Sequence, residues 1–225
     1  MLRVGLTGGL GSGKSTVAAM LAERGAVVVS SDELAREMMR PGEPVYRALV
    51  GAFGAGVVRS DGALDRPALA RIAFEQARVA ELEAIVHPAV LARQAEMADA
   101  LQQQRPDSVL VVESALLLTT QHAGEGGWRR RFDRIVVVTA PEEIRVARFA
   151  GRRSGGVDEA AAHAEARRRL SHQMPESEMA AQADFVLANT GSLEQLSQDV
   201  DQLWTALKAA QPKRTRQDLP PGSIQ

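Results

Sequence analysis

The sequence predicts an α/β fold in which a parallel sheet is flanked by helices. Two runs rich in valine, residues 109–112 and 135–138, are apolar throughout, as are strands covered on both faces. Helical patterns alternate with these runs. A glycine-rich loop at 8–13 joins another apolar run, at 3–7, to a helical pattern. Alternating strands and helices favour parallel strands joined by right-handed crossovers.

The expected elements follow from the apolar patterns in chain order. A short buried strand covers Arg3–Thr7, and an amphipathic helix runs from Lys14 to about Arg24. The remaining expected strands are Ala26–Ser30, Val109–Val112, Ile135–Val138 and Phe185–Leu187, and the remaining helices are Glu142–Arg152, Glu159–His172 and Leu193–Leu207.

Residues 33–105 interrupt this alternation. They contain several helical patterns but no strand pattern, and Pro and Gly residues divide them. We therefore expect a mainly helical insertion, within a nucleotide-binding core formed by 1–32 and 106–211. The breaks inside the insertion are Pro41-Gly42, Asp61-Gly62 and Pro67.

Composition excludes several classes of protein. The 225 residues are 45% hydrophobic and 24% charged, which is ordinary for a globular domain, and 212–225 alone reads as a disordered tail. A net charge of −1 argues against a protein whose main task is to neutralise nucleic acid. No apolar run approaches the roughly 18 residues of a membrane helix, and the N-terminus lacks a signal-peptide pattern. The absence of cysteine excludes thiolate chemistry and fits a cytoplasmic protein.

Residues 8–15, Gly-Gly-Leu-Gly-Ser-Gly-Lys-Ser, match the Walker A pattern between an expected strand and an expected helix. Glycines let backbone amides approach phosphate oxygens, and the helix N-terminus adds a positive dipole. Lys14 is expected to reach the β- and γ-phosphates of ATP, and Ser15 to ligate Mg²⁺. The candidate nucleotide-binding residues here are Gly8, Gly9, Gly11, Ser12, Gly13, Lys14, Ser15 and Thr16.

Two carboxylates follow expected strands at the edge of the sheet where ligands bind in open α/β folds. Asp32 is placed to accept a proton from an attacking hydroxyl or to hold Mg²⁺, with helix capping as the alternative role. Glu113 is placed to support Mg²⁺ through a water, or to act as a strand-end or helix-capping carboxylate. A proton acceptor beside a bound triphosphate indicates a kinase that phosphorylates an alcohol.

Arg148 and Arg152 are four residues apart on an expected helix and therefore share a face. Arginines on a mobile lid would neutralise charge on a transferring phosphoryl group, although in so arginine-rich a chain solvated side chains are the alternative. The N-K-x-D and D-x-x-G elements of a GTPase are absent from the sequence. Glu113 stands alone where AAA-type ATPases usually carry an acidic pair.

With these residues assembled, the chain resembles the dephospho-coenzyme A kinase family from about Leu2 to Leu207. The opening segment Gly5–Thr16 is more specific than a bare Walker A pattern. The other matching segments, in order, are Ser31–Arg36, Asp61–Arg66, Ile85–Pro88, Gln173–Pro175 and Ala183–Gly191.

The resemblance implies phosphoryl transfer from ATP to the ribose 3′-hydroxyl of dephospho-CoA. It implies that Asp32 is the general base, that 33–105 is the substrate domain and that 150–180 is a lid. A lone histidine such as His87 could equally be a buried, hydrogen-bonded one. The other residues that the resemblance assigns are Asn189 and Gly191 by the adenine of ATP, and Arg66, His87 and Arg148 in or near the substrate and phosphate sites.

Three positions depart from the family pattern. Ser30 stands where a second aspartate is usual, so a Mg²⁺ role for that position is open. Ala115 replaces a proline, and Met179 stands where lysine is common. These changes leave room for reduced activity or a shifted substrate.

Two other functions remain open from the sequence. One is a related P-loop kinase that acts on a nucleotide or another small alcohol, and the other is a nucleotide-dependent binding protein with little catalysis. The length of the 33–105 insertion favours an acceptor larger than a nucleoside monophosphate. We expect a monomer or small homo-oligomer with a small-molecule substrate and no nucleic-acid or membrane partner.

Overall fold

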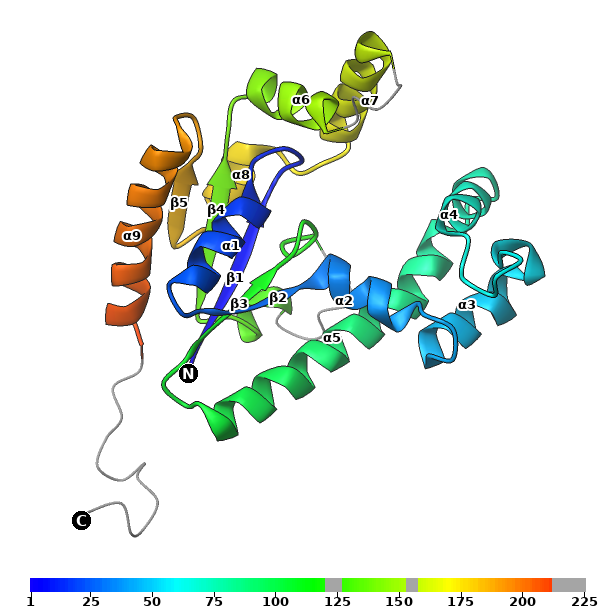
Figure 1. Cartoon of the computed structure of the whole chain (residues 1–225), viewed down its shortest axis with the longest axis horizontal. Helices are drawn as coiled ribbons and strands as arrows, with labels where there is room; N and C mark the ends of the chain where they lie inside the picture. The colour runs from blue at the N-terminus through cyan, green and yellow to red at the C-terminus, as the bar shows by residue number, and fades with distance from the viewer. Residues whose placement is uncertain (120–126, 153–157, 212–225) are drawn as a thin grey trace.

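The structure, a computed structural model, describes residues 1–119, 127–152 and 158–211. Five parallel strands form a sheet in the order β2-β3-β1-β4-β5, with helices on both faces (Figure 1). The predicted α/β fold is confirmed, and each expected strand is present within one residue of its expected bounds. The strands are β1 Leu2–Gly8, β2 Val27–Ser30, β3 Val109–Glu113, β4 Arg134–Thr139 and β5 Phe185–Ala188.

The central strand β1 lies between β3 and β4. Leu2 is in register with Val109 of β3, and Val4 with Arg134 of β4. At the edge of the sheet, Ser30 of β2 lies beside Glu113 of β3. Because all the strands are parallel, their carboxyl ends meet at one edge, and the residues that follow them meet there too.

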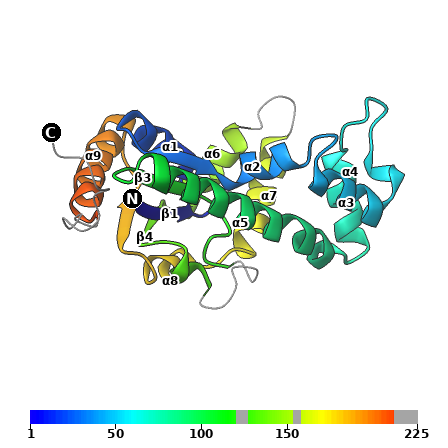
Figure 2. The same cartoon turned by 90° about the horizontal axis from the view of Figure 1, so that it is seen from below.

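Each face of the sheet has its own hydrophobic cluster. Helices α1 (Lys14–Glu23) and α9 (Leu193–Ala209) pack on one face, where they bury Val111 of β3. The next residue, Val112, points to the opposite face and joins the cluster that includes α5 (Val79–Gln104). This alternation is why the valine-rich strands are apolar throughout. Figure 2 shows α5 running along the sheet.

The expected insertion is helical in the structure, with α2 (Ser31–Met38), α3 (Pro44–Phe53) and α4 (Arg66–Glu75) preceding α5. We call α3 and α4 together the helical lobe, which projects from the sheet in Figure 1. Asp65 caps α4, since its carboxylate accepts from the Ala68 N–H at 3.0 Å.

One hydrophobic cluster joins this lobe to the sheet. Leu49 of α3 and Leu69 of α4 belong to the same cluster as Val112 and Val137 of the strands. The expected boundary between residues 32 and 33 falls in the first turn of α2, so this helix spans the boundary. The helices of 33–105 share their hydrophobic cluster with the sheet and have no separate core among the described clusters.

Two helices, α6 (Glu142–Gly151) and α7 (Glu159–Ser171), form the second projection of the molecule, which we call the arm. Phe149 and Ala166 pack between them. Residues 153–157 of the expected lid, like the expected tail at 212–225, lie outside the described residues.

The end of the expected lid belongs to the core. Helix α8 (Glu176–Ala180) packs against β4, and Met179, one of the departures from the family pattern, is buried in the sheet cluster. Among the described helices, none has the length and apolar character needed to cross a membrane.

Candidate active site

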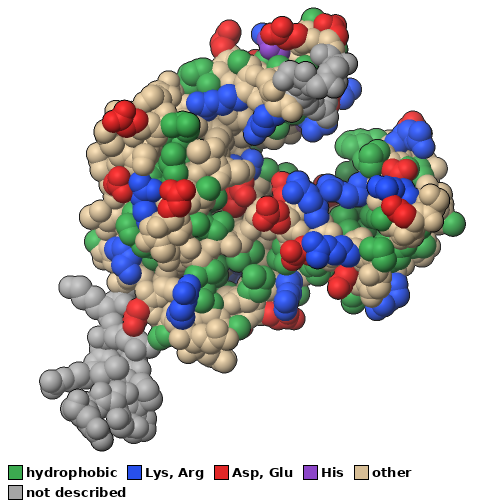
Figure 3. All heavy atoms as spheres, viewed as in Figure 1, with side chains coloured by type: hydrophobic (Ala, Val, Ile, Leu, Met, Phe, Trp, Pro, Cys, Tyr) green, Lys and Arg blue, Asp and Glu red, His purple; other side chains and the backbone are tan. Residues whose placement is uncertain are grey.

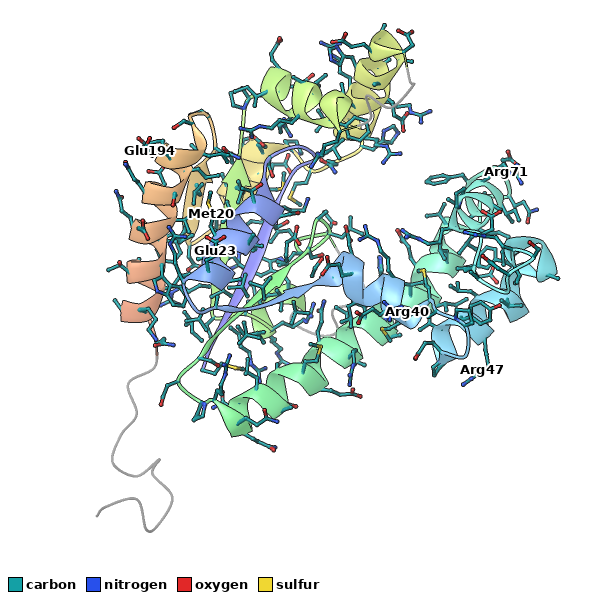
Figure 4. The ribbon with its side chains drawn as sticks, in the orientation of Figure 1. Met20, Glu23, Arg40, Arg47, Arg71 and Glu194 are labelled. Carbon is teal, nitrogen blue, oxygen red and sulfur yellow. The ribbon has the colours of Figure 1, made fainter. Side chains whose placement is uncertain are left out.

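The candidate site lies at the carboxyl ends of the strands, between the arm and the helical lobe. Figure 3 shows the molecule hollowed between these two projections, with Lys and Arg side chains on both sides. Figure 4 shows Arg47 and Arg71 on opposite sides of the lobe, and Arg40 between the lobe and the sheet. The basic side chains on the two sides of the hollow in Figure 3 suit a polyanionic ligand.

The glycine loop between β1 and α1 requires glycine at defined positions. Gly11 and Gly13 have φ values of 75° and 96°, in the left-handed region that side chains disfavour. A Cβ on Gly13 would lie 2.2 Å from Nδ2 of Asn189, and one on Gly11 would lie 2.4 Å from the carbonyl oxygen of Arg145. The loop therefore combines an unusual backbone with contacts that leave no room for a side chain.

Side chains from distant parts of the chain hold this loop. The Leu10 N–H donates to Oε1 of Gln173 at 2.9 Å, and Nδ2 of Asn189 donates to the carbonyl oxygen of Ser12 at 2.8 Å. Asn189 is 5% exposed. Arg148 adds hydrogen bonds to Asn189 and, at 3.4 Å, to the Ser12 carbonyl. The loop is thus anchored to the arm and to the end of β5.

An ion pair fixes the base of the arm near the loop. Nε of Arg145 lies 3.4 Å from Oε1 of Glu176, and the two side chains are 13% and 22% exposed. The same Glu176 oxygen accepts from the Ala140 N–H at 3.2 Å. A Cβ on Gly9 would lie 2.6 Å from Nη1 of Arg145, so this guanidinium packs directly against the loop.

A pocket beside the loop, with a volume of about 380 Å³, brings together many of the predicted nucleotide-binding residues. Arg148 is half-buried and bonded as described above, while Arg152 is exposed on the same side of α6. Gly8 and Gly9 line a separate hollow with Gln173. The predicted residues that line the nucleotide pocket are Gly11, Gly13, Thr16, Arg148, Arg152, Asn189 and Gly191.

The two predicted Mg²⁺ residues, Ser15 in the first turn of α1 and Glu113 at the end of β3, contact each other. Oγ of Ser15 donates to Oε1 of Glu113 at 2.7 Å. Glu113 is 8% exposed and ends β3, which is the strand-end position considered from the sequence. Lys14, the first residue of α1, is half-buried. Hydroxyl and carboxylate oxygens are ligands that Mg²⁺ accepts, so these residues fit a Mg²⁺ ion shared with phosphate oxygens.

Other groups near this position do not form a metal site by themselves. In the part of the chain that the structure describes, no three His, Asp or Glu side chains group closely enough to hold a metal. Ser30, which replaces an aspartate of the family pattern, caps α2, with the Glu33 N–H donating to its Oγ at 3.4 Å. Asp32 itself therefore lies inside the first turn of α2 and is not its N-cap.

On the other side of the strand ends lies a pocket of about 130 Å³, which we call the acceptor pocket. Asp32 is exposed at its wall, and His87 of α5 is half-buried in it. Arg66 begins α4 and is exposed, and it is not one of the described residues that line this pocket. The polar side chains of the wall are Ser31, Asp32, His87, Gln94, Ser114 and Arg131.

Sequence reasoning missed several residues that shape the site. Gln173 was named only within a segment that resembles the family. No pattern near it in the sequence predicts its hydrogen bond to the glycine loop. Arg145, Gln94 and Arg131 were not singled out. Burial lowers the pKa of the Arg131 guanidinium, and no spacing pattern in the sequence could have revealed that burial.

Comparisons with known proteins agree with this geometry. A model of the dephospho-CoA kinase family matches residues 2–195. The chain is 39% identical to the dephospho-CoA kinase of Moorella thermoacetica, over 92% of this chain and 93% of that one. It is 42% identical to the enzyme of Corynebacterium jeikeium, over 92% of this chain and 100% of that one.

Among solved structures, TT1252 from Thermus thermophilus matches with a TM-score of 0.68 and 36% identity, over 92% of this chain and 97% of that one. Dephospho-CoA kinase from Campylobacter jejuni matches in fold with a TM-score of 0.63 and 20% identity, over 92% and 97% of the two chains. The matches in sequence cover almost the whole described chain, from the glycine loop to α9. The chain therefore belongs to the dephospho-CoA kinase family of P-loop kinases.

Proposed function

We propose that this protein transfers the γ-phosphoryl group of ATP to the ribose 3′-hydroxyl of dephospho-CoA, which gives coenzyme A and ADP. The observation that carries the proposal is the position of Asp32. This carboxylate is exposed in the acceptor pocket, which lies at the same sheet edge as the glycine loop. A carboxylate there can accept the proton of an alcohol as that alcohol attacks the phosphorus.

On the nucleotide side, the loop amides and Lys14 hold the β- and γ-phosphates of ATP. Ser15 and Glu113 hold Mg²⁺, with Glu113 acting through a water. A bound Mg²⁺ supplies charge neutralisation at the phosphate oxygens. Arg148 and Arg152 neutralise the charge of the transferring group from α6. Phosphoryl transfer through a loose transition state needs mainly positioning and charge stabilisation. The loop amides, Lys14 and the two arginines supply most of both.

The remaining assignments concern the ends of the two substrates. Asn189 and Gly191 line the nucleotide pocket on the side of β5, which supports a place for the adenine of ATP there. His87, which lines the acceptor pocket, contacts dephospho-CoA there. Arg66, which begins α4 outside that pocket, contacts dephospho-CoA from the lobe. In this scheme 33–105 binds the acceptor, and the part of 150–180 that includes α7 covers the nucleotide.

Product analysis tests the proposal. The protein is incubated with MgATP and dephospho-CoA, and the products are identified by mass spectrometry and by ³¹P NMR, which locates the new phosphate. We expect coenzyme A phosphorylated at the ribose 3′ position. Parallel reactions with a nucleoside monophosphate test the related-kinase alternative. If no acceptor is phosphorylated at high enzyme concentration while ATP binds tightly, the binding-protein alternative replaces the proposal.

A further inference from the structure

A buried glutamine lies at the base of the acceptor pocket. Gln94, in the middle of α5, is 4% exposed. Its Nε2 donates to Oγ of Ser31 at 2.9 Å, and its Oε1 accepts from Nη2 of Arg131. These side chains come from α5, from the start of α2 and from the segment before β4, and all three line the pocket. We call Ser31, Gln94 and Arg131 the relay.

The chemistry of the three groups fixes the direction of the relay. A guanidinium can only donate hydrogen bonds, so Arg131 must face the amide oxygen of Gln94. The amide NH₂ group is then left to face the hydroxyl of Ser31. Both ends of the buried amide have partners, and a buried amide without them would be costly. The orientation of Gln94 is therefore determined from both sides.

The two ends of the relay are held differently. Arg131 lies next to β4, and its guanidinium stacks 5.1 Å from the ring centre of the buried Phe132. Within the described ranges, burial is the cause that shifts the pKa of Arg131, with no carboxylate contributing. Gln94 supplies this buried cation with an acceptor oxygen. The Arg131 end of the relay is thus anchored in the core.

The other end of the relay is the first turn of α2. Ser31 is the first residue of this helix and Asp32 is the second. The capping bond from the Glu33 N–H to Ser30 is 3.4 Å long, whereas the bond from Gln94 to Ser31 is 2.9 Å. Asp32 itself is exposed, so burial of its own side chain does not fix it. The relay is the shorter of the two side-chain links at this helix start.

We propose that Gln94 is a positioning residue that holds the first turn of α2, and with it Asp32, in place relative to the glycine loop. This inference rests on the proposed role of Asp32 as the proton acceptor. A shift of the helix start moves the carboxylate relative to the acceptor alcohol and the phosphorus. Phosphoryl transfer depends on that alignment. Binding of ATP in the nucleotide pocket, on the other side of the strand ends, does not depend on it.

The test compares substitutions that break the relay with one that preserves it. Gln94→Met keeps the side-chain length but removes both hydrogen bonds, and we expect kcat with dephospho-CoA to fall about 10-fold while the KM for ATP stays unchanged. Ser31→Ala breaks the same link, so the double variant Ser31→Ala/Gln94→Met should be no slower than the slower single variant. Gln94→Glu can accept from both Arg131 and the Ser31 hydroxyl, and should recover most of the loss.

A matched control is Gln103→Met, an exposed glutamine on the same helix, which should keep the parent kcat. A second measurement does not depend on turnover: amide hydrogen exchange at 34–37, whose N–H groups bond to the carbonyls of the first turn of α2, should be faster in Gln94→Met than in the parent and in Gln103→Met. Should Gln94→Met fold poorly, Ser31→Ala carries both measurements as the variant that breaks the relay, and Gln94→Glu serves as the variant that preserves it.

The outcomes separate this inference from the proposed function. Parent-like kcat and parent-like exchange in folded Gln94→Met and Ser31→Ala would overturn the relay. If the parent phosphorylates no dephospho-CoA, the proposed function fails instead. The exchange measurement then decides alone whether Gln94 holds α2, with faster exchange supporting the relay and unchanged exchange overturning it.

Discussion

The glycine loop and the wall of the acceptor pocket are built in different ways. The loop is closely surrounded, since Gln173, Asn189 and Arg148 bond to its backbone and its glycines leave no space for side chains. At the acceptor wall, by contrast, Asp32 is exposed on the first turn of a helix, and only the neighbouring Ser31 links that turn to a buried side chain, Gln94. The loop is thus held by several direct contacts, whereas the carboxylate of the acceptor wall depends on the placement of a helix start.

This difference between the loop and the acceptor wall matches the two functions of a kinase site, which are to bind ATP and to align the acceptor. In the proposed function, groups around the loop bind and neutralise phosphates, so their substitution should weaken ATP binding or the stabilisation of the transferring group. In the same proposal, groups in the acceptor wall align the alcohol, so their substitution should affect turnover with little effect on ATP binding. The following substitutions test this separation.

The largest effect is expected for Lys14→Ala. Removal of the ammonium that we propose faces the β- and γ-phosphates should lower kcat by about 10³-fold, the scale of losing one preorganised charge-stabilising donor. Steady-state assays with saturating substrates measure the effect. Lys208→Ala, the same change at an exposed lysine of α9, serves as the control and should leave kcat unchanged. An equal loss in both variants would show that Lys14 has no special role.

Gly13→Ala should weaken ATP binding at least about 10-fold, because it combines left-handed strain with a clash against Asn189. Isothermal titration calorimetry with ATP measures this. Gly42→Ala separates strain from clash, since Gly42 has a similar φ of 94° but no atom within 4 Å of an added Cβ. If Gly13→Ala binds ATP as the parent does, the loop is less tightly built than the structure indicates.

Gln173→Met should raise the KM for ATP about 3- to 10-fold. The substitution removes the acceptor of the Leu10 N–H, which lies 163 residues away in sequence, and so loosens the loop from the arm. The KM for dephospho-CoA should change less. A larger change in the KM for the acceptor than in that for ATP would contradict the separation of the two regions.

The smallest effect is expected far from both regions. Asp201 of α9 pairs with Arg24 at 2.7 Å, and the hydrogen bond from Arg24 lowers the pKa of this carboxylate. A depressed pKa in the folded state stabilises the protein above the pKa of the unfolded chain, and this stabilisation is lost as pH falls through the folded value.

Asp201→Asn should therefore lower Tm slightly at neutral pH and leave kcat unchanged. The difference in Tm between parent and variant should shrink as the pH is lowered from neutrality through the ordinary aspartate pKa of about 4, since the parent carboxylate progressively becomes protonated. Thermal unfolding followed by circular dichroism across this range checks the trend. A difference that grows on acidification would contradict the pairing with Arg24.

Local patterns predicted the framework of the molecule well. Valine-rich runs and the Walker A spacing located the strands and the glycine loop because these depend on neighbouring residues. Asp32 was placed at the correct edge of the sheet because parallel strands share a carboxyl edge. The capping of α2 by Ser30 also follows from a local preference.

Contacts across long stretches of chain could not be predicted in the same way. The bonds from Gln173 to Leu10 and from Asn189 to Ser12 join residues 163 and 177 positions apart. Gln94 lies in the long helix α5, and its burial depends on how that helix packs against α2 and the sheet. Such contacts arise from tertiary packing, which a local pattern does not encode.

The most direct test of the account is Asp32→Asn, which keeps the size of the side chain and removes its ability to take a proton. Turnover of dephospho-CoA and the Kd for ATP are measured on the same preparation. We expect kcat to fall by about 10²-fold or more, the scale of a positioned proton acceptor, while the Kd for ATP stays at the parent value. Full turnover in Asp32→Asn would contradict the account.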